Sequence, residues 1–342
     1  MYFASPRPFT RLILTLSCLS LVFLTPLRAQ AEPAATVGVL VVAHGADSAW
    51  NARVDAVVAA VEWPGPVETV YLMGSAAESR SWDRAVARLA ARGATRAIAV
   101  PLMVSSYGAH VRQMQYYAGE RPDLPPELAA MGHAHHPMGG NPIPVTVTGA
   151  LDDAPELGVV LRDRFMALGA SARLAPLVLV AHGPSREGDV AAWVAGIRRA
   201  TAPLTAAHAH APIRIGLLRD DADPPVRALA ITALRDTIRA LAARAGDSVT
   251  VMTVLVSSGE IDRVKVPNDL VGLPMRYVGS VLAPHPALAE WIGRAARAQR
   301  ARIAALQPSS QVDRERLANE ERRHANHEQP EDRLDEDGAP EP

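Results

Sequence analysis

A short motif that occurs twice, each time at the end of an aliphatic run, most constrains how this chain can fold. Residues 41–45 (Val-Val-Ala-His-Gly) match residues 179–183 (Leu-Val-Ala-His-Gly). Two further pairs follow in the same order, namely the Val-Ser-Ser segments at 104–106 and 256–258, and the segments 149–155 and 279–286. Three matches in one order indicate an internal duplication. The two halves of the chain are therefore expected to share a fold.

The chain between residues 37 and 305 alternates short aliphatic runs with longer amphipathic stretches. Continuous runs of Val, Ile and Leu are typical of parallel strands that are covered on both faces. The predicted strands are residues 37–43, 67–73, 97–104, 143–149, 177–181, 213–218, 249–256 and 275–279. The predicted helices are residues 49–62, 81–92, 155–168, 189–202, 225–244 and 286–305. This order predicts an α/β fold with two tandem, doubly wound, Rossmann-like parallel sheets related by duplication.

The length of 342 residues and an apolar fraction of 49% suit two packed domains. We predict an amino-terminal domain at residues 37–170 and a carboxyl-terminal domain at residues 171–306. The first domain carries an insert at residues 116–142, because the spacing between its third and fourth strands is longer than in the second. A net charge of −1 and few aromatic residues argue against nucleic acid as a partner.

Both ends of the chain differ in composition from its middle. Arg7 and Arg11 precede an apolar run that ends in Ala29-Gln30-Ala31, which predicts a signal peptide at residues 1–31 and export to the periplasm or the medium. An uncleaved membrane anchor is the alternative. Residues 307–342 are charged and poor in aliphatic side chains, so we predict a disordered tail. After signal cleavage we expect no membrane association, and either a monomer or a homodimer.

The mature chain would contain no cysteine, because the only one, Cys18, lies inside the predicted signal. Any metal must therefore be held by histidine, carboxylate or carbonyl groups. His44 follows the first predicted strand and His110 comes shortly after the third. Ligands of open parallel sheets bind at the carboxyl ends of the strands, so both imidazoles are expected to face one site. Hydrogen bonding within the loops is the competing explanation for each histidine.

The same residues carry a resemblance to a known family. Three features of the sequence resemble the sirohydrochlorin cobaltochelatase and ferrochelatase family. They are a strand that ends in Ala-His-Gly, the segment 100–104 followed by Ser, Gly and His, and the Gly-Ser-Val-Leu-Ala-Pro-His-Pro run at 279–286. The resemblance covers about residues 37–300, apart from the insert. It implies two chelatase-like domains that insert a divalent metal, such as cobalt, nickel or iron, into a sirohydrochlorin-type tetrapyrrole without ATP. The metal is then a substrate, and no permanently bound cofactor is expected.

The resemblance also implies the roles of individual residues. His44 and His110 are expected to bind the metal and to accept the pyrrole protons. Both tasks need neutral imidazole, so activity should fall in acid. The tetrapyrrole is expected to contact Gly45, Ser105, Ser106, Gly108 and His182. The insert histidines His133, His135 and His136 are candidates for metal delivery, with chance clustering in a loop as the alternative.

The chain departs from the family pattern in two places, and it carries one further cluster of possible metal ligands. No acidic residue ends the second strand, and Glu78 a few positions later is the candidate substitute, although it could simply begin a helix. The second half lacks a counterpart of His110, so its site is expected to be a degenerate copy around His182. Asp220, Asp221 and Asp223 could bind a hard cation, but a helix-capping turn is favoured because prolines follow.

Other protein classes fit the motifs less well. A histidine phosphatase would need Arg where the chain has Ala43, and no Gly-x-Ser-x-Gly motif indicates a hydrolase. The glycine signatures of phosphate-binding and dinucleotide-binding loops are absent from the sequence too. The remaining alternative is an exported protein that keeps the chelatase fold but only binds a metal or a tetrapyrrole. The predicted signal peptide favours it, because tetrapyrrole assembly is expected in the cytoplasm.

Overall fold

The computed structural model describes residues 36–130, 140–208 and 211–306. The predicted signal peptide and the predicted tail lie outside these residues. The three insert histidines, His133, His135 and His136, also lie outside them. The described residues therefore comprise the two predicted α/β halves, apart from part of the insert and residues 209 and 210.

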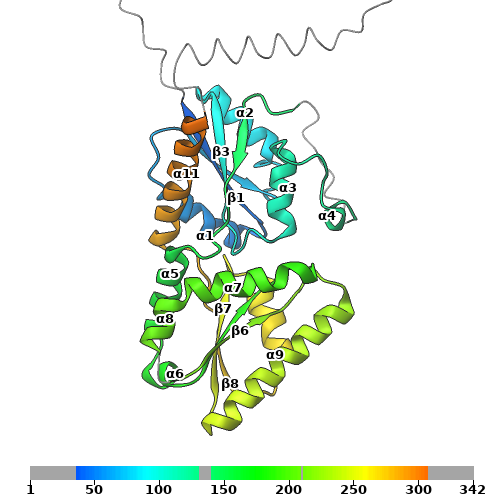
Figure 1. Cartoon of the computed structure of the whole chain (residues 1–342), viewed down its shortest axis with the longest axis vertical. Helices are drawn as coiled ribbons and strands as arrows, with labels where there is room; N and C mark the ends of the chain where they lie inside the picture. Colours follow the sequence, from blue (N-terminus) through cyan, green and yellow to red (C-terminus); the bar gives the residue numbers. More distant parts are fainter. Residues whose placement is uncertain (1–35, 131–139, 209–210, 307–342) are drawn as a thin grey trace, which may run out of the picture. The chain divides into compact units, whose positions relative to one another are not determined.

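Two parallel sheets of four strands form the centre of the described chain (Figure 1). The first sheet has the order β2-β1-β3-β4 and the second has the order β6-β5-β7-β8. The strands are β1 (Val37–Ala43), β2 (Val67–Tyr71), β3 (Arg96–Pro101), β4 (Val145–Val147), β5 (Leu177–Ala181), β6 (Ile213–Leu217), β7 (Val249–Val254) and β8 (Met275–Val278). All neighbouring strands run parallel. The identical order confirms the predicted fold class and its duplication.

Burial explains why the central strands read as uninterrupted aliphatic runs. Residues 39–43 of β1 and all five residues of β5 are fully buried, because helices cover both faces of these strands. The edge strands β2 and β6 are only partly buried, and their sequences contain polar residues such as Glu68 and Arg214. The hydrophobic effect therefore fixes which strands lie at the centre of each sheet.

The helices connect the strands in the predicted alternation. Those of the first half are α1 (Ser48–Ala59), α2 (Trp82–Ala91), α3 (Ala109–Tyr117), α4 (Pro126–Ala130) and α5 (Pro155–Met166). Those of the second half are α6 (Ala170–Leu174), η1 (Glu187–Asp189), α7 (Val190–Ala200), α8 (Ala202–Ala207), α9 (Pro224–Ala245), η2 (Ile261–Lys265), α10 (Val266–Asp269) and α11 (Pro286–Leu306). Their ends follow local rules: Asp47 caps α1 by accepting from Trp50 N, and Gly246 ends α9 at φ 67°.

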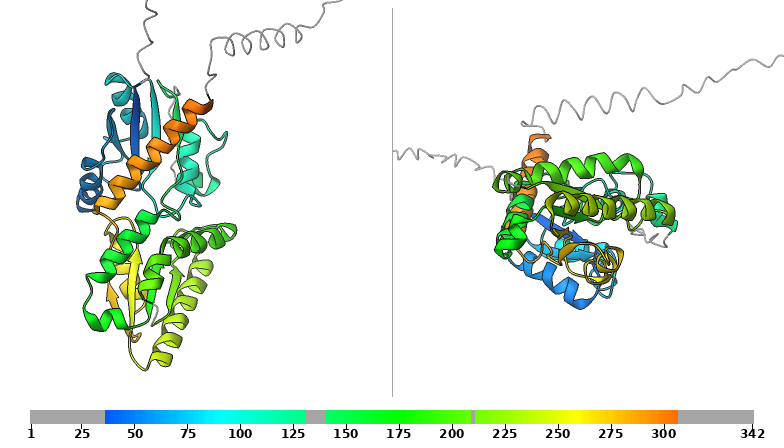
Figure 2. Two further views of the ribbon diagram at one scale, coloured as in Figure 1. Left: turned by 60° about the vertical axis from the view of Figure 1, so that its left-hand side comes forward. Right: turned by 90° about the horizontal axis from the view of Figure 1, so that it is seen from below.

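The last helix of each half packs against the other half. Helix α11 contacts β1, β3 and α1 of the first half, whereas α5 contacts α7 and α8 of the second (Figure 2). Arg294 of α11 joins these two helices through a bidentate ion pair with Glu156 of α5, at 2.6 and 2.7 Å. The helices thus pack across the predicted boundary at residues 170 and 171, while each sheet lies entirely on one side of it.

One element near the predicted site differs from the expectation. His110 was expected in a loop after the third strand, but it lies in the first turn of α3. This helix was not predicted because its buried face includes the polar residue Gln113. None of the helices in the described part of the chain is long and apolar enough to span a membrane.

Candidate functional site

His44 is placed by the carboxyl end of β1 and the sharp turn that follows it. Its Nδ1 lies 2.8 Å from the carbonyl oxygen of Gly45, and its own carbonyl accepts a hydrogen bond from Met73 N at 2.8 Å. Gly45 has φ 82°, and an added Cβ would lie 2.3 Å from the carbonyl oxygen of Met73. Glycine is therefore required for both the backbone conformation and the close approach.

His110 reaches the same edge of the sheet from helix α3. Gly108 is the N-cap residue of this helix, so His110 lies in its first turn, beyond the carboxyl end of β3. Its Nδ1 lies 3.0 Å from Oε1 of Gln113, one helical turn further along. An oxygen acceptor beside each Nδ1 favours the tautomer with the proton on that nitrogen, so Nε2 carries the lone pair when the imidazole is neutral.

The two imidazoles lie together at the carboxyl edge of the first sheet. The ring centres of His44 and His110 are 5.1 Å apart, with an angle of 82° between the ring planes. Imidazole nitrogens bind divalent metals at about 2.1 Å, so rings at this separation can reach one ion. Trp50 of α1 stands beside them, with its ring centre 6.5 Å from that of His44. The structure brings the predicted pair together, while their role as metal ligands stays a prediction.

The two serines predicted to contact the tetrapyrrole make hydrogen bonds within the protein. Asp152 Oδ1 accepts from the backbone N of Ser106 at 2.8 Å and from the hydroxyl of Ser105 at 3.3 Å. The Ser106 hydroxyl donates to Asp152 Oδ2, and Ser105 is buried. These contacts hold the loop that leads into α3. Sequence patterns gave no indication of Asp152, which lies 46 residues further along the chain from Ser106.

Glu78 makes no recorded contact with the histidine pair in the described part of the chain, and its role stays a prediction. Glu78 is exposed in the turns that follow β2, and within the described residues it makes no hydrogen bond or ion pair. The end of β2 is instead occupied by Tyr71, whose hydroxyl lies 2.8 Å from Asp55 Oδ1 and 3.0 Å from the carbonyl of Asn51. Burial, reinforced by Asp55, raises the pKa of the Tyr71 hydroxyl far above its ordinary value. Tyr71 therefore stays neutral and cannot replace the missing carboxylate.

The second half also contacts the segments that carry the histidine pair. The indole Nε1 of Trp193 on α7 donates to the carbonyl of Tyr107, three residues before His110, at 2.7 Å. The hydroxyl of Ser257 donates to the carbonyl of Trp50 at 3.0 Å. Ser257 is the counterpart of Ser105 in the duplication. The hydrogen bond from Ser257 to Trp50 joins the two halves, which fits the expectation that the second half supports the site of the first.

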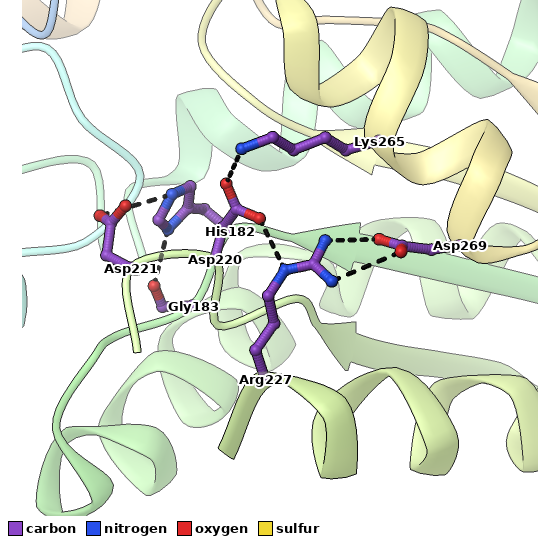
Figure 3. A network of polar contacts seen from close by, with 7 residues as sticks. All are labelled: His182, Gly183, Asp220, Asp221, Arg227, Lys265 and Asp269. Carbon is purple, nitrogen blue, oxygen red and sulfur yellow. Dashed lines mark hydrogen bonds and ion pairs between the residues drawn. The ribbon is translucent and has the colours of Figure 1, made fainter. Parts of the chain in front are cut away.

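The corresponding edge of the second sheet holds His182 in a network of ion pairs (Figure 3). Nδ1 of His182 lies 2.9 Å from the carbonyl of Gly183, which repeats the geometry of His44. Ligand atoms of His182, Asp220 and Asp221 lie within 4.8 Å of one another. The two oxygens of Asp220, however, bind Arg227 Nε at 2.8 Å and Lys265 Nζ at 2.7 Å. Lys265, the only lysine of the chain, thus supplies positive charge that a metal would otherwise provide.

The Asp220 network predicts a pH-dependent contribution to stability. Burial favours the neutral acid, but the hydrogen bonds from Lys265 and Arg227 outweigh it and hold the pKa of Asp220 below its usual value. A depressed carboxyl pKa stabilises the fold above the unfolded-state pKa, and this contribution is lost as the pH falls through the folded-state pKa. Asp220→Asn should therefore lower the free energy of unfolding at pH 7 by about 1–3 kcal/mol.

Urea unfolding of both proteins between pH 7 and pH 3 tests this prediction. The difference between wild type and Asp220→Asn should shrink as the pH drops below about 4, the usual range for aspartate. Asp223→Asn is the matched control, because Asp223 begins α9 without a side-chain capping bond. A difference that stays constant with pH would contradict the role given to the Asp220 carboxylate.

The chain is similar to known proteins in both sequence and structure. The CbiX family matches residues 38–168. No curated protein matches the chain. Among solved structures, SirB from Bacillus subtilis with Fe³⁺ has a TM-score of 0.54 at 16% identity, covering 79% of this chain and 98% of that one. The sirohydrochlorin chelatase SirB from Bacillus subtilis subspecies spizizenii, in complex with cobalt, has a TM-score of 0.48 at 16% identity, covering 77% and 94%.

The family match and the geometry concern the same part of the chain. Residues 38–168 contain β1 with His44, β3 and α3 with His110. The likeness to SirB with Fe³⁺ spans both halves and shows that they share its fold. Residues 38–168, which carry the histidine pair, thus match the CbiX family, and the predicted resemblance to the sirohydrochlorin chelatases is confirmed.

Proposed function

We propose that this protein inserts a divalent metal into a tetrapyrrole of the sirohydrochlorin type, without ATP. The CbiX match and the fold shared with SirB support metal insertion in general. Cobalt is the first candidate metal, with nickel and iron as alternatives, since imidazole ligands bind all three. The predicted signal peptide supports the further proposal that the protein acts after export, in the periplasm or the medium.

The observation that carries this proposal is the pair of imidazoles, 5.1 Å apart, at the carboxyl edge of the first sheet. Metal insertion exchanges one divalent ion for two pyrrole N–H protons, so the site must hold the ion and accept protons. Nε2 of His44 and Nε2 of His110 can displace water from the ion, and each imidazole can afterwards take up one proton. The protons then leave to solvent, because His44 is exposed.

A turnover measurement separates this proposal from stoichiometric binding. Purified protein at about 1 µM is mixed with sirohydrochlorin and Co²⁺ in large excess, and the absorption change of the macrocycle is followed. A chelatase should convert many equivalents faster than the reaction without protein. An exported binding protein, the alternative that the predicted signal peptide favours, should alter at most one equivalent per chain. The second result would overturn the enzymatic proposal.

A further inference from the structure

Gln113 is a buried polar residue in helix α3 whose amide group is hydrogen-bonded through both its oxygen and its nitrogen. Its side chain is buried, with 2% exposure, on the face of α3 that packs into the first half. Oε1 lies 3.0 Å from Nδ1 of His110, and Nε2 donates to the hydroxyl of Tyr117 at 2.8 Å. Burying an amide is unfavourable unless both of its ends are hydrogen-bonded, and here both are.

Tyr117 in turn is buried in the hydrophobic core that α2 and α3 form with the first sheet. Its ring packs against that of Trp82 with centres 5.7 Å apart, and its carbonyl accepts from Asn141 Nδ2 at 2.8 Å. The indole Nε1 of Trp82 donates to Asn141 Oδ1 at 2.9 Å. Gln113 is thus linked through hydrogen bonds and ring packing to residues of α2, α3 and the segment before β4. Its amide cannot rotate without breaking a buried hydrogen bond.

The two histidines of the site are oriented by different kinds of acceptor. For His44 the acceptor is the backbone carbonyl of Gly45, at 2.8 Å from Nδ1. For His110 it is the side chain of Gln113, at 3.0 Å. Each acceptor fixes the tautomer and the rotation of its ring, as the outer-shell partners of metal-binding histidines do elsewhere. Only the acceptor of His110 can be removed by a side-chain substitution.

We infer that Gln113 is a positioning residue for the metal substrate: it holds His110 in the tautomer that presents Nε2 to the ion. This inference rests on the proposed function, because it assigns the His110 ring to metal binding. Gln113 itself contacts neither the metal nor the tetrapyrrole. Loss of its acceptor oxygen lets the ring rotate and the tautomers interchange. The affinity for the metal should then fall although both histidines remain.

Metal affinity of the full chain, measured by Co²⁺ titration with absorption detection, tests the inference without turnover. Gln113→Met, which keeps the length of the side chain but has no acceptor oxygen, should weaken Co²⁺ binding about 10- to 100-fold. Gln113→Glu keeps an oxygen that can accept from both His110 Nδ1 and the Tyr117 hydroxyl, so it should bind like wild type. Gln115→Met is the matched control, because it makes the same change two residues further along α3.

A double-substitution cycle separates the role of Gln113 from other metal-binding groups of the chain. In the His110→Ala background, Gln113→Met should cause no further loss of Co²⁺ affinity, because its effect passes through the His110 ring. Thermal unfolding of each variant checks that the fold is retained. If the methionine variant is unstable, a loss of Co²⁺ affinity in Gln113→Glu would still overturn the inference, since both hydrogen bonds can form in that variant.

The outcomes distinguish the inference from the proposed function. If wild type binds none of Co²⁺, Ni²⁺ and Fe²⁺, the proposed function fails. If wild type binds and Gln113→Met binds equally well, the proposed function stands and the positioning role of Gln113 is overturned. Equal losses in Gln113→Met and Gln113→Glu, or in Gln115→Met, would also overturn it, because the effect would then come from packing rather than from the acceptor oxygen.

Discussion

Replacing either His44 or His110 by alanine should lower the rate of metal insertion about 100-fold or more, which is the usual effect of removing a positioned proton acceptor. Each substitution also removes one of the two proposed metal ligands, so the affinity for Co²⁺ should fall in the same variants. The rings lie 5.1 Å apart, and alanine at either position removes one imidazole of this pair. Initial rates with sirohydrochlorin and Co²⁺ measure the first effect, and metal titration measures the second.

His182→Ala is the matched control for these substitutions. His182 follows β5 as His44 follows β1, and the Nδ1 of each lies beside the carbonyl of the following glycine. Of the two carboxylates near His182, that of Asp220 is already bound by Lys265 and Arg227. His182→Ala should therefore reduce turnover much less than the other two substitutions. Equal losses in all three variants would show that the second sheet shares the reaction, contrary to the proposed division of roles.

The strands and the pairing of the histidines could be predicted because they follow from local patterns. Residues 37–43 and 177–181 form β1 and β5 with the predicted bounds, since uninterrupted aliphatic runs occur where a strand is covered on both faces. The approach of His44 and His110 follows from the rule that parallel strands end at one edge. Neither prediction needed knowledge of packing.

The partners of the site residues could not be predicted from these patterns. Asp152 reaches Ser106 across 46 residues, and such a contact depends on how β4 ends beside β3. Gln113 occupies a buried position of α3 that a hydrophobic pattern assigns to an aliphatic residue, so the helix itself was missed. The packing of α5 and α11 against the opposite half could not be predicted either, because the pattern of an amphipathic helix does not specify which half it packs against.

In the turn after β1, one added carbon atom should affect both the fold and the site. Gly45 and Gly93 have nearly the same positive φ, 82° and 83°. A Cβ at Gly45 would lie 2.3 Å from the Met73 carbonyl oxygen and 2.9 Å from Tyr71 Cβ, whereas nothing lies within 4 Å of a Cβ at Gly93. The pair therefore separates the effect of φ from the effect of the close contact.

Gly93→Ala should lower the free energy of unfolding by about 1–2 kcal/mol, the range for an L-residue in the left-handed conformation. Gly45→Ala should lower it by about 3 kcal/mol or more, because overpacking adds its own unfavourable contribution. The extra loss arises between the turn and the end of β2, where Met73 N donates to the His44 carbonyl at 2.8 Å. Folded Gly45→Ala should thus also bind Co²⁺ more weakly, whereas Gly93→Ala should not. Urea unfolding and Co²⁺ titration measure the two effects, and equal destabilisation by both substitutions would contradict the close approach at Gly45.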